Sequence, residues 1–374
     1  MRTRADSFAS RVVAAAAQPA RPWLHVTVSP RIARLLVAAG AGPAPAQPGE
    51  DLRNAKLSGA TLTRADLTGA DLTGADLTGA DLGHADLTGA TLTDADLAGA
   101  DLGHADLTGA TLTGADLGHA DLTGATLTDA NLSRATLRGA TLRGATLRGA
   151  NLRDANLRDA GLYSADLTGA ILTGADLTGA GLYSADLTGA ILTGPDLTRA
   201  TLTGATLTRA ILTGANLTRA NLRDANLRGA VLTRANLGDA DLTGETLAGA
   251  DLTGASLRDA ILTGANLTDA NLTRAALVSA SLTDANLTRA DLTGATLGHA
   301  DLTGADLTGA DLTVATLTDA GLAGMLWSDH TEWPGTMARA IRDRSEKVRP
   351  GVWRVVGSGS ADAEIDAPLA PVPR

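Results

Sequence analysis

Leucine recurs at every fifth residue through most of this 374-residue chain, from Leu52 to Leu322, in 55 consecutive occurrences. The residue two places before each Leu is nearly always Ala, and the residue between them is mostly Asp, Asn or Thr. Thr-Gly, Arg-Gly, Gly-His or Arg-Asp commonly follows, so the unit is Ala-(Asp/Asn/Thr)-Leu-Thr-Gly. We number its places 1 to 5, with Ala at position 1 and Leu at position 3. Apolar side chains therefore occupy positions 1 and 3, and the other positions are mostly polar or Gly.

A period of five fits neither an α-helix nor a flat strand. On a helix, successive Leu side chains would drift by about 140° and spiral around the surface. On a flat strand they would alternate between the two faces. Either element would leave many Leu side chains in water, at a cost of about 1.5 to 3 kcal/mol each. The pattern therefore predicts a winding chain that turns by the same amount at every unit.

Units such as 65–69 (Ala-Asp-Leu-Thr-Gly) and 215–219 (Ala-Asn-Leu-Thr-Arg) resemble the pentapeptide-repeat family, and about 270 of the 374 residues share the pattern. The resemblance implies an all-β fold, a right-handed quadrilateral β-helix with one unit per side and four units per coil. Leu and the preceding Ala would point inward. At the β spacing of about 4.8 Å, about 14 coils would form a rod about 65 Å long.

Three segments are expected. Residues 1–50 form a basic, Ala- and Pro-rich arm and linker that is partly disordered, residues 51–324 form the β-helix, and residues 325–374 form a C-terminal cap with a disordered tail. Trp327 falls at the next Leu position and would plug the last coil, and Trp333 precedes a Pro that would stop further stacking. Within the cap, residues 337–348 are predicted to form a short amphipathic helix and residues 352–356 a strand.

Acidic side chains are concentrated near the start of the repeats. Residues 51–130 carry 13 Asp against Arg53, Lys56 and Arg64, a net charge of −10, and residues twenty apart would stack on one side. Three such ladders are Asp66, Asp86 and Asp106; Asp81, Asp101 and Asp121; and Asp76, Asp96 and Asp116. Duplex DNA carries about one charge per 1.7 Å, a density similar to that of these four coils. The ladders indicate a DNA mimic; alternatively, Asp is the usual residue of this position and serves solubility.

Two further surfaces follow the acidic ladders. A basic band comprises Arg134, Arg138, Arg143, Arg148, Arg153 and Arg158. This band is either an anion-binding patch or ordinary surface. An outward apolar ladder comprises Ile171, Ile191, Ile211 and Val231, with Tyr163 and Tyr183 on another side nearby. Exposed apolar stripes often mark contact surfaces, which predicts a protein contact or a homodimer, while β-branched strand preference is the alternative. A Thr ladder at residues 173 to 313 raises ice binding as a more distant alternative.

Catalytic and cofactor chemistry is not expected. The chain has no Cys, and the stacked His84 and His104 lack the further ligands that a metal site needs, so neither a metal nor a cofactor is predicted. Glu245 and Pro195 replace the inward Ala and break the repeat, most simply as local distortions. No run of 18 apolar residues is present, so no membrane segment is expected and the default location is cytoplasmic.

Two functions remain open. Resemblance to the topoisomerase-protecting and quinolone-resistance members of the family implies a non-catalytic protein that mimics DNA and binds a type II topoisomerase, with DNA gyrase as the candidate partner. No direct binding to nucleic acid is expected. The alternative is a structural scaffold or spacer that holds protein partners without DNA mimicry, because the fold alone does not specify an activity.

Overall fold

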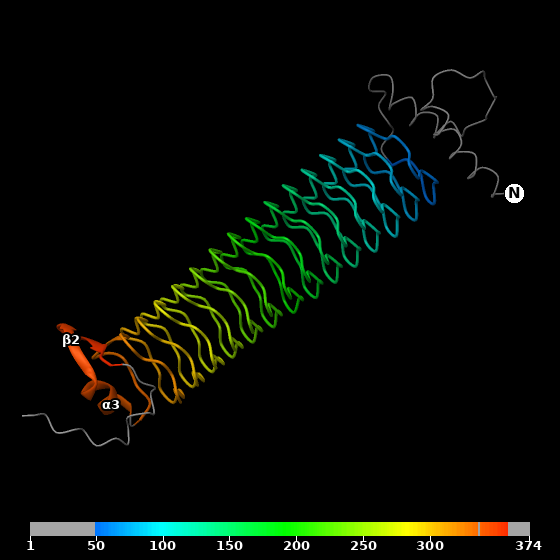
Figure 1. Cartoon of the computed structure of the whole chain (residues 1–374). Coiled ribbons are helices and arrows are strands. Elements are labelled where there is room, and N and C mark those ends of the chain that lie inside the picture. Colours follow the sequence, from blue (N-terminus) through cyan, green and yellow to red (C-terminus); the bar gives the residue numbers. More distant parts are fainter. Residues whose placement is uncertain (1–48, 336, 358–374) are drawn as a thin grey trace, which may run out of the picture. The chain divides into compact units, whose positions relative to one another are not determined.

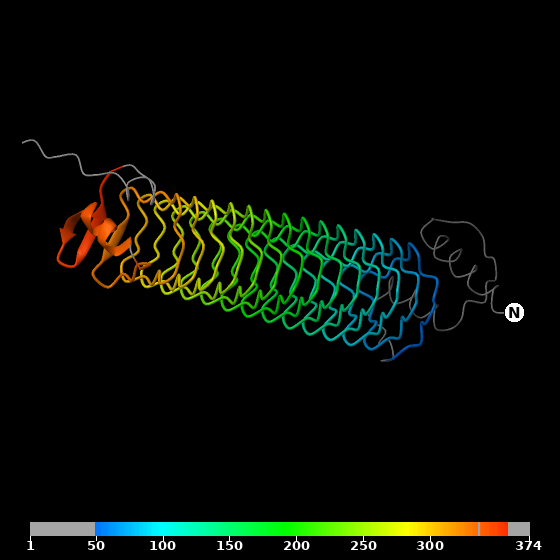
Figure 2. The ribbon, with the colours of Figure 1, turned by 90° about the horizontal axis from the view of Figure 1, so that it is seen from below.

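The computed structural model describes residues 49–335 and 337–357, and these belong to two compact units divided between Ile191 and Leu192. In each unit the chain winds in stacked coils, as Figures 1 and 2 show. A turn closes every five-residue unit, and position 2 forms a parallel bridge with the residue twenty places later, as in Asp81 with Asp101. Four five-residue repeats therefore complete one coil, and each coil has four sides.

Backbone hydrogen bonds join each coil to the next. The amide of Leu72 donates to the carbonyl of Thr91 at 2.7 Å, and the amide of Gly74 donates to the carbonyl of Thr93 at 2.9 Å. In the opposite direction, the amide of Asp76 donates to the carbonyl of Ala55 at 2.9 Å. The same three bonds recur along both units, so the main chain is satisfied without any long strand.

The interior of the coils is built from Leu and Ala alone through most of the repeats. The Leu side chains at position 3 are at most 4% exposed, and Ala side chains at position 1 are buried from Ala60 onward. Position 2 and position 4 side chains, which flank the inward Leu, point outward. The predicted β-helix with an inward Leu column is confirmed.

The turn at position 5 explains the preference for Gly. The φ angle there lies near +60° in unit after unit, a conformation that favours residues without a Cβ. Asp, Asn, His, Ser and Arg also adopt this positive φ at position 5. Among the described residues, Val314 is the β-branched residue with a positive φ, at +51°. Val314 is also 70% exposed, so it combines backbone strain with an apolar surface.

A small cap follows the repeats in the second unit. The cap contains a three-stranded antiparallel sheet in the order β1-β3-β2, formed by β1 (Leu326–Ser328), β2 (Ser345–Arg349) and β3 (Val352–Val355). Helix α3 (Met337–Asp343) lies beside this sheet. Leu326 also bridges Asp306 in parallel, which joins the sheet to the preceding coil.

The predicted helix over 337–348 is too long. It ends at Asp343, and the following residues form β2, because Glu346 and Lys347 pair with β3 across a turn at Gly351, where φ is +74°. The strand predicted over 352–356 is present as β3. The predictions for the N-terminal arm up to residue 48 and for the tail after Gly357 lie outside the described residues.

Candidate protein-interaction surface

Each Asp at position 2 is held by its own turn. In the unit of Asp106, Oδ1 accepts the amide of Thr108 at 2.9 Å and its hydroxyl at 2.6 Å. Partial burial opposes ionisation of Asp86, but hydrogen bonds from Thr88 and Thr68 hold the pKa of this carboxyl below its usual value. The turn therefore fixes the orientation of the carboxylate, and Asp86 is charged at neutral pH.

The predicted acidic ladders lie on three of the four sides in the first unit. Bridges connect Asp66 to Asp86 to Asp106, and the other two ladders are bridged in the same way. Asp86, Asp96, Asp101, Asp106, Asp116 and Asp121 are exposed, and Asp66, Asp76 and Asp81 are half-buried. Residues 65–133 contain twelve Asp and neither Lys nor Arg, and we call this stretch the acidic zone.

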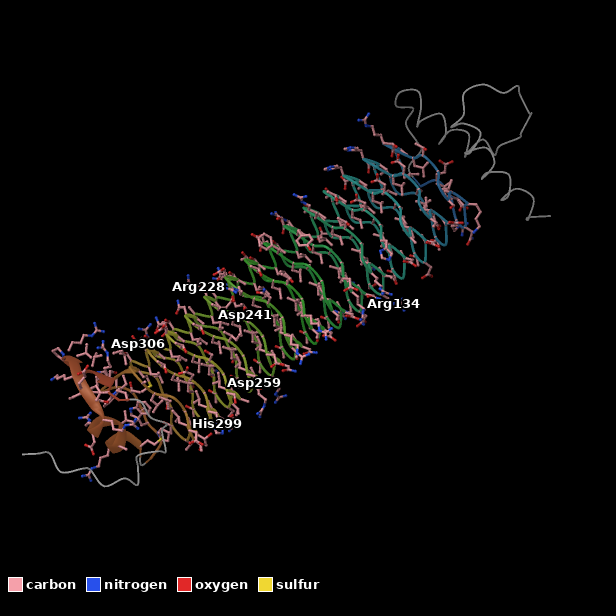
Figure 3. The ribbon with its side chains drawn as sticks, viewed as in Figure 1. Arg134, Arg228, Asp241, Asp259, His299 and Asp306 are labelled. Carbon is pink, nitrogen blue, oxygen red and sulfur yellow. The ribbon has the colours of Figure 1, made fainter. Side chains whose placement is uncertain are left out.

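The basic band forms a belt around one coil. Five of its arginines occupy position 4 of five consecutive five-residue repeats, so they cover all four sides of the coil. We call these residues the arginine belt: Arg138, Arg143, Arg148, Arg153 and Arg158. Arg134 lies at the position 5 turn and extends outward, as labelled in Figure 3.

Position-4 side chains reach position 2 of the next coil, eighteen residues later. Arg148 pairs in this way with Asp166, and Arg158 pairs with Asp176 at 3.5 Å. Arg143 has Gly161 at that place, which offers no carboxylate. The belt is thus partly neutralised on some sides and retains its charge on others.

The apolar residues form separate surfaces. Ile171 bridges Ile191 in the first unit, and Ile211 bridges Val231 in the second, where Ile211 is 37% exposed. The side that carries Tyr163 and Tyr183 is opposite the side of Ile171, because the two are two five-residue units apart on a four-sided coil. Tyr and Ile therefore do not make one contact stripe within the first unit. Ile261, 44% exposed, is a further outward apolar residue that was not predicted, because the residues one coil away from it, Asp241 and Ser281, are polar.

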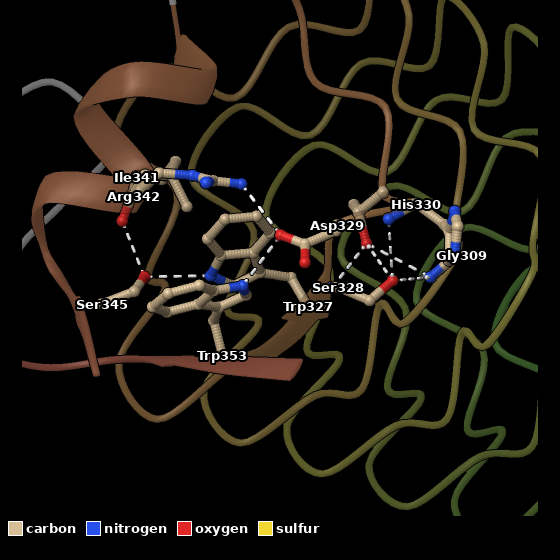
Figure 4. Close-up of polar contacts among 10 residues, drawn as sticks. Gly309, Trp327, Ser328, Asp329, His330, Ile341, Arg342, Ser345 and Trp353 are labelled. Atoms are coloured by element: carbon tan, nitrogen blue, oxygen red, sulfur yellow. Dashed lines mark hydrogen bonds and ion pairs between the residues drawn. The ribbon is translucent and has the colours of Figure 1, made fainter. Parts of the chain in front are cut away.

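The cap surrounds Trp327, which is 2% exposed (Figure 4). Its ring stacks on Trp353 at 5.9 Å and meets Trp333 edge-on at 6.1 Å. Asp329 Oδ1 accepts both the Trp353 indole N–H, at 3.0 Å, and Arg342 Nη2, at 2.9 Å. The plug expected at Trp327 is therefore a cluster, and Trp353 was not foreseen because its partner lies 26 residues away in sequence.

Glu245 is a carboxyl in the apolar core of the second unit. Its exposure is 0%, and neither oxygen has a hydrogen-bond partner among the described residues. Burial, together with the charges of Asp224 and Asp241, raises its pKa to about 9. The surrounding ladder is stretched, since the bond from Thr246 N to Ala225 O is 3.4 Å where most equivalents are 2.9 Å. The distortion predicted at this residue is present.

Three other features considered from the sequence are the stacked histidines, the Thr ladder and a membrane-spanning segment. The His84 and His104 rings stack at 5.1 Å, and in the part of the chain that the structure describes no group of three or more His, Cys, Asp or Glu could hold a metal ion. Some hydroxyls of the Thr ladder donate to a neighbouring carboxylate on the outer surface, as Thr253 does to Asp251 at 2.5 Å, which leaves fewer of them for ice. No helix among the described residues is long and apolar enough to span a bilayer.

These features define a β-helical repeat protein whose outer surface carries acidic, basic and apolar side chains. The model of the family described as pentapeptide repeats matches in eight copies, at residues 51–89, 90–129, 130–169, 155–194, 196–234, 210–244, 247–284 and 280–319. The chain belongs to the pentapeptide-repeat family, whose fold is the right-handed quadrilateral β-helix.

Solved structures of the same kind are similar to the chain. HetL, a pentapeptide-repeat protein involved in heterocyst differentiation regulation from the cyanobacterium Nostoc sp. strain PCC 7120, is 42% identical over 55% of this chain and 89% of its own, with a TM-score of 0.31. QnrB1, a plasmid-mediated fluoroquinolone resistance protein, is 18% identical over 55% of this chain and 98% of its own, with a TM-score of 0.32. No curated protein matches the chain.

Proposed function

We propose that the acidic zone docks into a positively charged groove of a protein that otherwise holds duplex DNA, with DNA gyrase as the candidate partner. The observation that supports this proposal is the run of twelve Asp, uninterrupted by Lys or Arg, over residues 65–133. This stretch covers less than four coils, or about 16 Å, at the β spacing. Its charge density of roughly one per 1.4 Å is comparable to the one per 1.7 Å of duplex DNA.

The rigidity of the zone supports the same function. Oδ1 of the exposed ladder residues is held by the turn, as in Asp101 with Gly103 N at 2.8 Å and Asp116 with Gly118 N at 2.8 Å. Carboxylates held in this way lose little conformational freedom when a partner binds. Carboxylates on successive coils of one side therefore form a regularly spaced row of charges.

The test replaces charge without disturbing the fold. Asp86, Asp96, Asp106 and Asp116 are changed together to Asn, which the chain already uses at position 2. Asn131 Oδ1 accepts the amide of Ser133 at 3.1 Å, just as Asp does in its own units, so the variant should keep its turns. Binding of the full chain to purified gyrase is measured by biolayer interferometry at low and moderate salt, with duplex DNA as competitor.

The wild type should bind most tightly at low salt, and DNA should compete, because exposed charges act through a screened field. The four-Asn variant should bind about tenfold more weakly or worse. A matched control changes Asp291, Asp301, Asp306 and Asp311 to Asn in the second unit and should bind like the wild type. Absence of binding at low salt, or equal binding by both variants, contradicts the proposal.

The scaffold function is the second candidate, and the arginine belt favours it because a uniform DNA mimic has no use for a ring of cations. In that case partners recovered with the full chain would be unchanged by the four-Asn variant. Both functions are non-catalytic, and for either we place the protein in the cytoplasm.

A further inference from the structure

One side of the first unit carries opposite chemistry on its two halves. Consecutive bridges connect six position-2 residues along this side, and each coil adds one position-4 residue. Position 2 comprises Asp81, Asp101, Asp121, Thr141, Gly161 and Gly181; position 4 comprises Gly83, Gly103, Thr123, Arg143, Tyr163 and Tyr183. We call this the Asp–Tyr side. Three coils of carboxylates are therefore followed by three coils with a cation and two phenols.

The two halves match under a two-fold rotation. Consider a second copy that packs against this side with its stack of coils antiparallel to the first. The two-fold axis then lies in the interface, between the coil of Asp121 and the coil of Arg143. Position 2 then faces position 2, and position 4 faces position 4. The coil of Tyr163 meets the partner's coil of Gly103, and the coil of Tyr183 meets the partner's coil of Gly83. Each contact occurs twice, as in any isologous interface.

Glycines of the second copy face the two tyrosines in this arrangement. Tyr163 and Tyr183, 47% and 51% exposed, are opposite Gly103 and Gly83, respectively, at a position where Thr is the usual residue. Asp81 and Asp101 are opposite Gly181 and Gly161. Among the repeat units between residues 51 and 324, Gly occurs at position 2 elsewhere only at Gly321. Both position-2 glycines lie under the ring of Tyr163, since a Cβ on Gly161 would be 3.3 Å from its Cε2. Asp81 and Asp101 of the second copy therefore face this ring.

The charges of the two halves are complementary. Arg143 lacks the carboxylate that Arg148 finds at Asp166, because Gly161 stands at the equivalent place. In the antiparallel pair, the facing coil carries Asp121, displaced by two residues along the strand, or about 6.6 Å, which an Arg side chain spans. Arg143 of one copy can then pair with Asp121 of the other.

Tyr163 supplies a hydrogen-bond donor at a matching place. Its ring lies across the backbone of the next coil, since a Cβ on Gly181 would be 2.8 Å from both Cζ and Oη of this side chain. Gly181 is the residue that faces Asp81 of the second copy. The phenol hydroxyl is therefore opposite a carboxylate that can accept a hydrogen bond from it.

We propose that the Asp–Tyr side is a homodimer interface, in which two copies pack antiparallel through this face of the first unit. The occupant is a second copy because the acidic half supplies the carboxylates that Arg143 and the Tyr163 hydroxyl of the other half can bind. The dimer covers one acidic ladder and leaves the ladders of Asp66 and Asp76 open, so it is compatible with the proposed docking. A strip of six coils, about 29 Å long, is small, so the dimer should be weak and salt-sensitive.

Charge reversal at the central pair tests the interface. Arg143→Glu places two carboxylates opposite each other, and Asp121→Lys places two cations opposite each other; Lys already occurs at position 2 as Lys56. Sedimentation velocity of the full chain at low salt is run on each variant, on their equimolar mixture and on the double variant. Each single variant should dissociate about tenfold more readily than the wild type. The mixture and the double variant should recover the association, because both restore two opposite-charge pairs.

A steric variant separates the interface from folding. Gly83→Thr with Gly103→Thr restores the common residue of position 4 and should keep the melting temperature at or above that of the wild type, yet it fills the space opposite the tyrosines and should weaken the dimer. A wild type that stays monomeric at low salt and high concentration overturns the proposal. So does a mixture that associates no better than its components, or a dimer lost only on Ile171→Asp with Ile191→Asp on the opposite side.

Discussion

Glu245 illustrates how strongly a single side chain depends on its place in the coil. The residues one coil away on the same column are Ala225 and Ala265, both buried and apolar. A carboxyl put in that column cannot reach water and finds no donor among the described residues. The protein therefore carries a proton there at neutral pH, and the adjacent inter-coil bonds lengthen to accommodate the larger side chain.

Glu245→Ala should stabilise the second unit, by an amount that depends on pH. The folded-state pKa of about 9 lies above the ordinary value of 4.5, so the contribution of Glu245 to stability is fully present below pH 4.5 and is lost as the pH rises through 9. At pH 7 the loss is about 3 kcal/mol, at 1.36 kcal/mol per pKa unit. Melting temperatures of wild type and variant at pH 5, 7 and 9 should diverge with rising pH.

The equivalent residue one coil later serves as the control for this prediction. Ala265→Glu places the same acid in the same column and should destabilise the protein, again more at high pH than at low pH. A difference between wild type and Glu245→Ala that does not change with pH would mean that the carboxyl is solvated.

At the level of elements, the cap closes the open end of the second unit. Trp327 packs between Trp353 and Trp333 and donates from Nε1 to Ser345 Oγ at 2.9 Å, so it joins β1 to the start of β2. Ile341, 2% exposed, brings α3 onto the same interior. Terminal coils of a solenoid lack a neighbour on one side, which makes such caps necessary.

Trp327→Ala should open the cap and loosen the last coils. Large-to-small replacement of a buried Trp typically costs 3–5 kcal/mol, and the loss should appear as faster hydrogen exchange over residues 301–327. Exchange over residues 81–121, in the first unit, should not change. Val348→Ala, at a residue 44% exposed in β2, is the control and should leave exchange near the wild-type rate. Uniform acceleration across both units would contradict a local capping role.

At the level of the whole molecule, each of the two compact units is a series of similar coils that contact their neighbours within the unit. Residues 161–180 and 181–200 differ at two positions, Ala175 against Pro195 and Gly179 against Arg199. Such a repeat is consistent with duplication of a whole coil. In solenoids, stability is close to a sum of repeat and neighbour terms, so length should be adjustable in steps of one coil.

Deletion of residues 161–180 should leave a folded β-helix, because Ala160 then precedes Gly181 with the period and the side of every later residue unchanged. The calorimetric unfolding enthalpy should fall by about 14 kcal/mol, at about 0.7 kcal/mol per residue, and the circular-dichroism spectrum should keep its shape. Deletion of residues 161–178 shifts every later Leu out of phase and should disrupt the structure. A folded product from the second deletion, or none from the first, would contradict this prediction.

The five-residue period alone was sufficient to predict the inward Leu column and the outward ladders, since burying every Leu requires a chain that turns equally at each unit. It was not sufficient to place the surfaces. Whether Arg143 finds a carboxylate, and whether Tyr163 shares a side with Asp101 or with Ile171, depends on residues 18 and 20 places apart that only a coil of four sides brings together. Within the predicted cap, strand β2 escaped prediction for a related reason: Ser345–Arg349 follows a helix in sequence, but pairing with β3 decides its conformation.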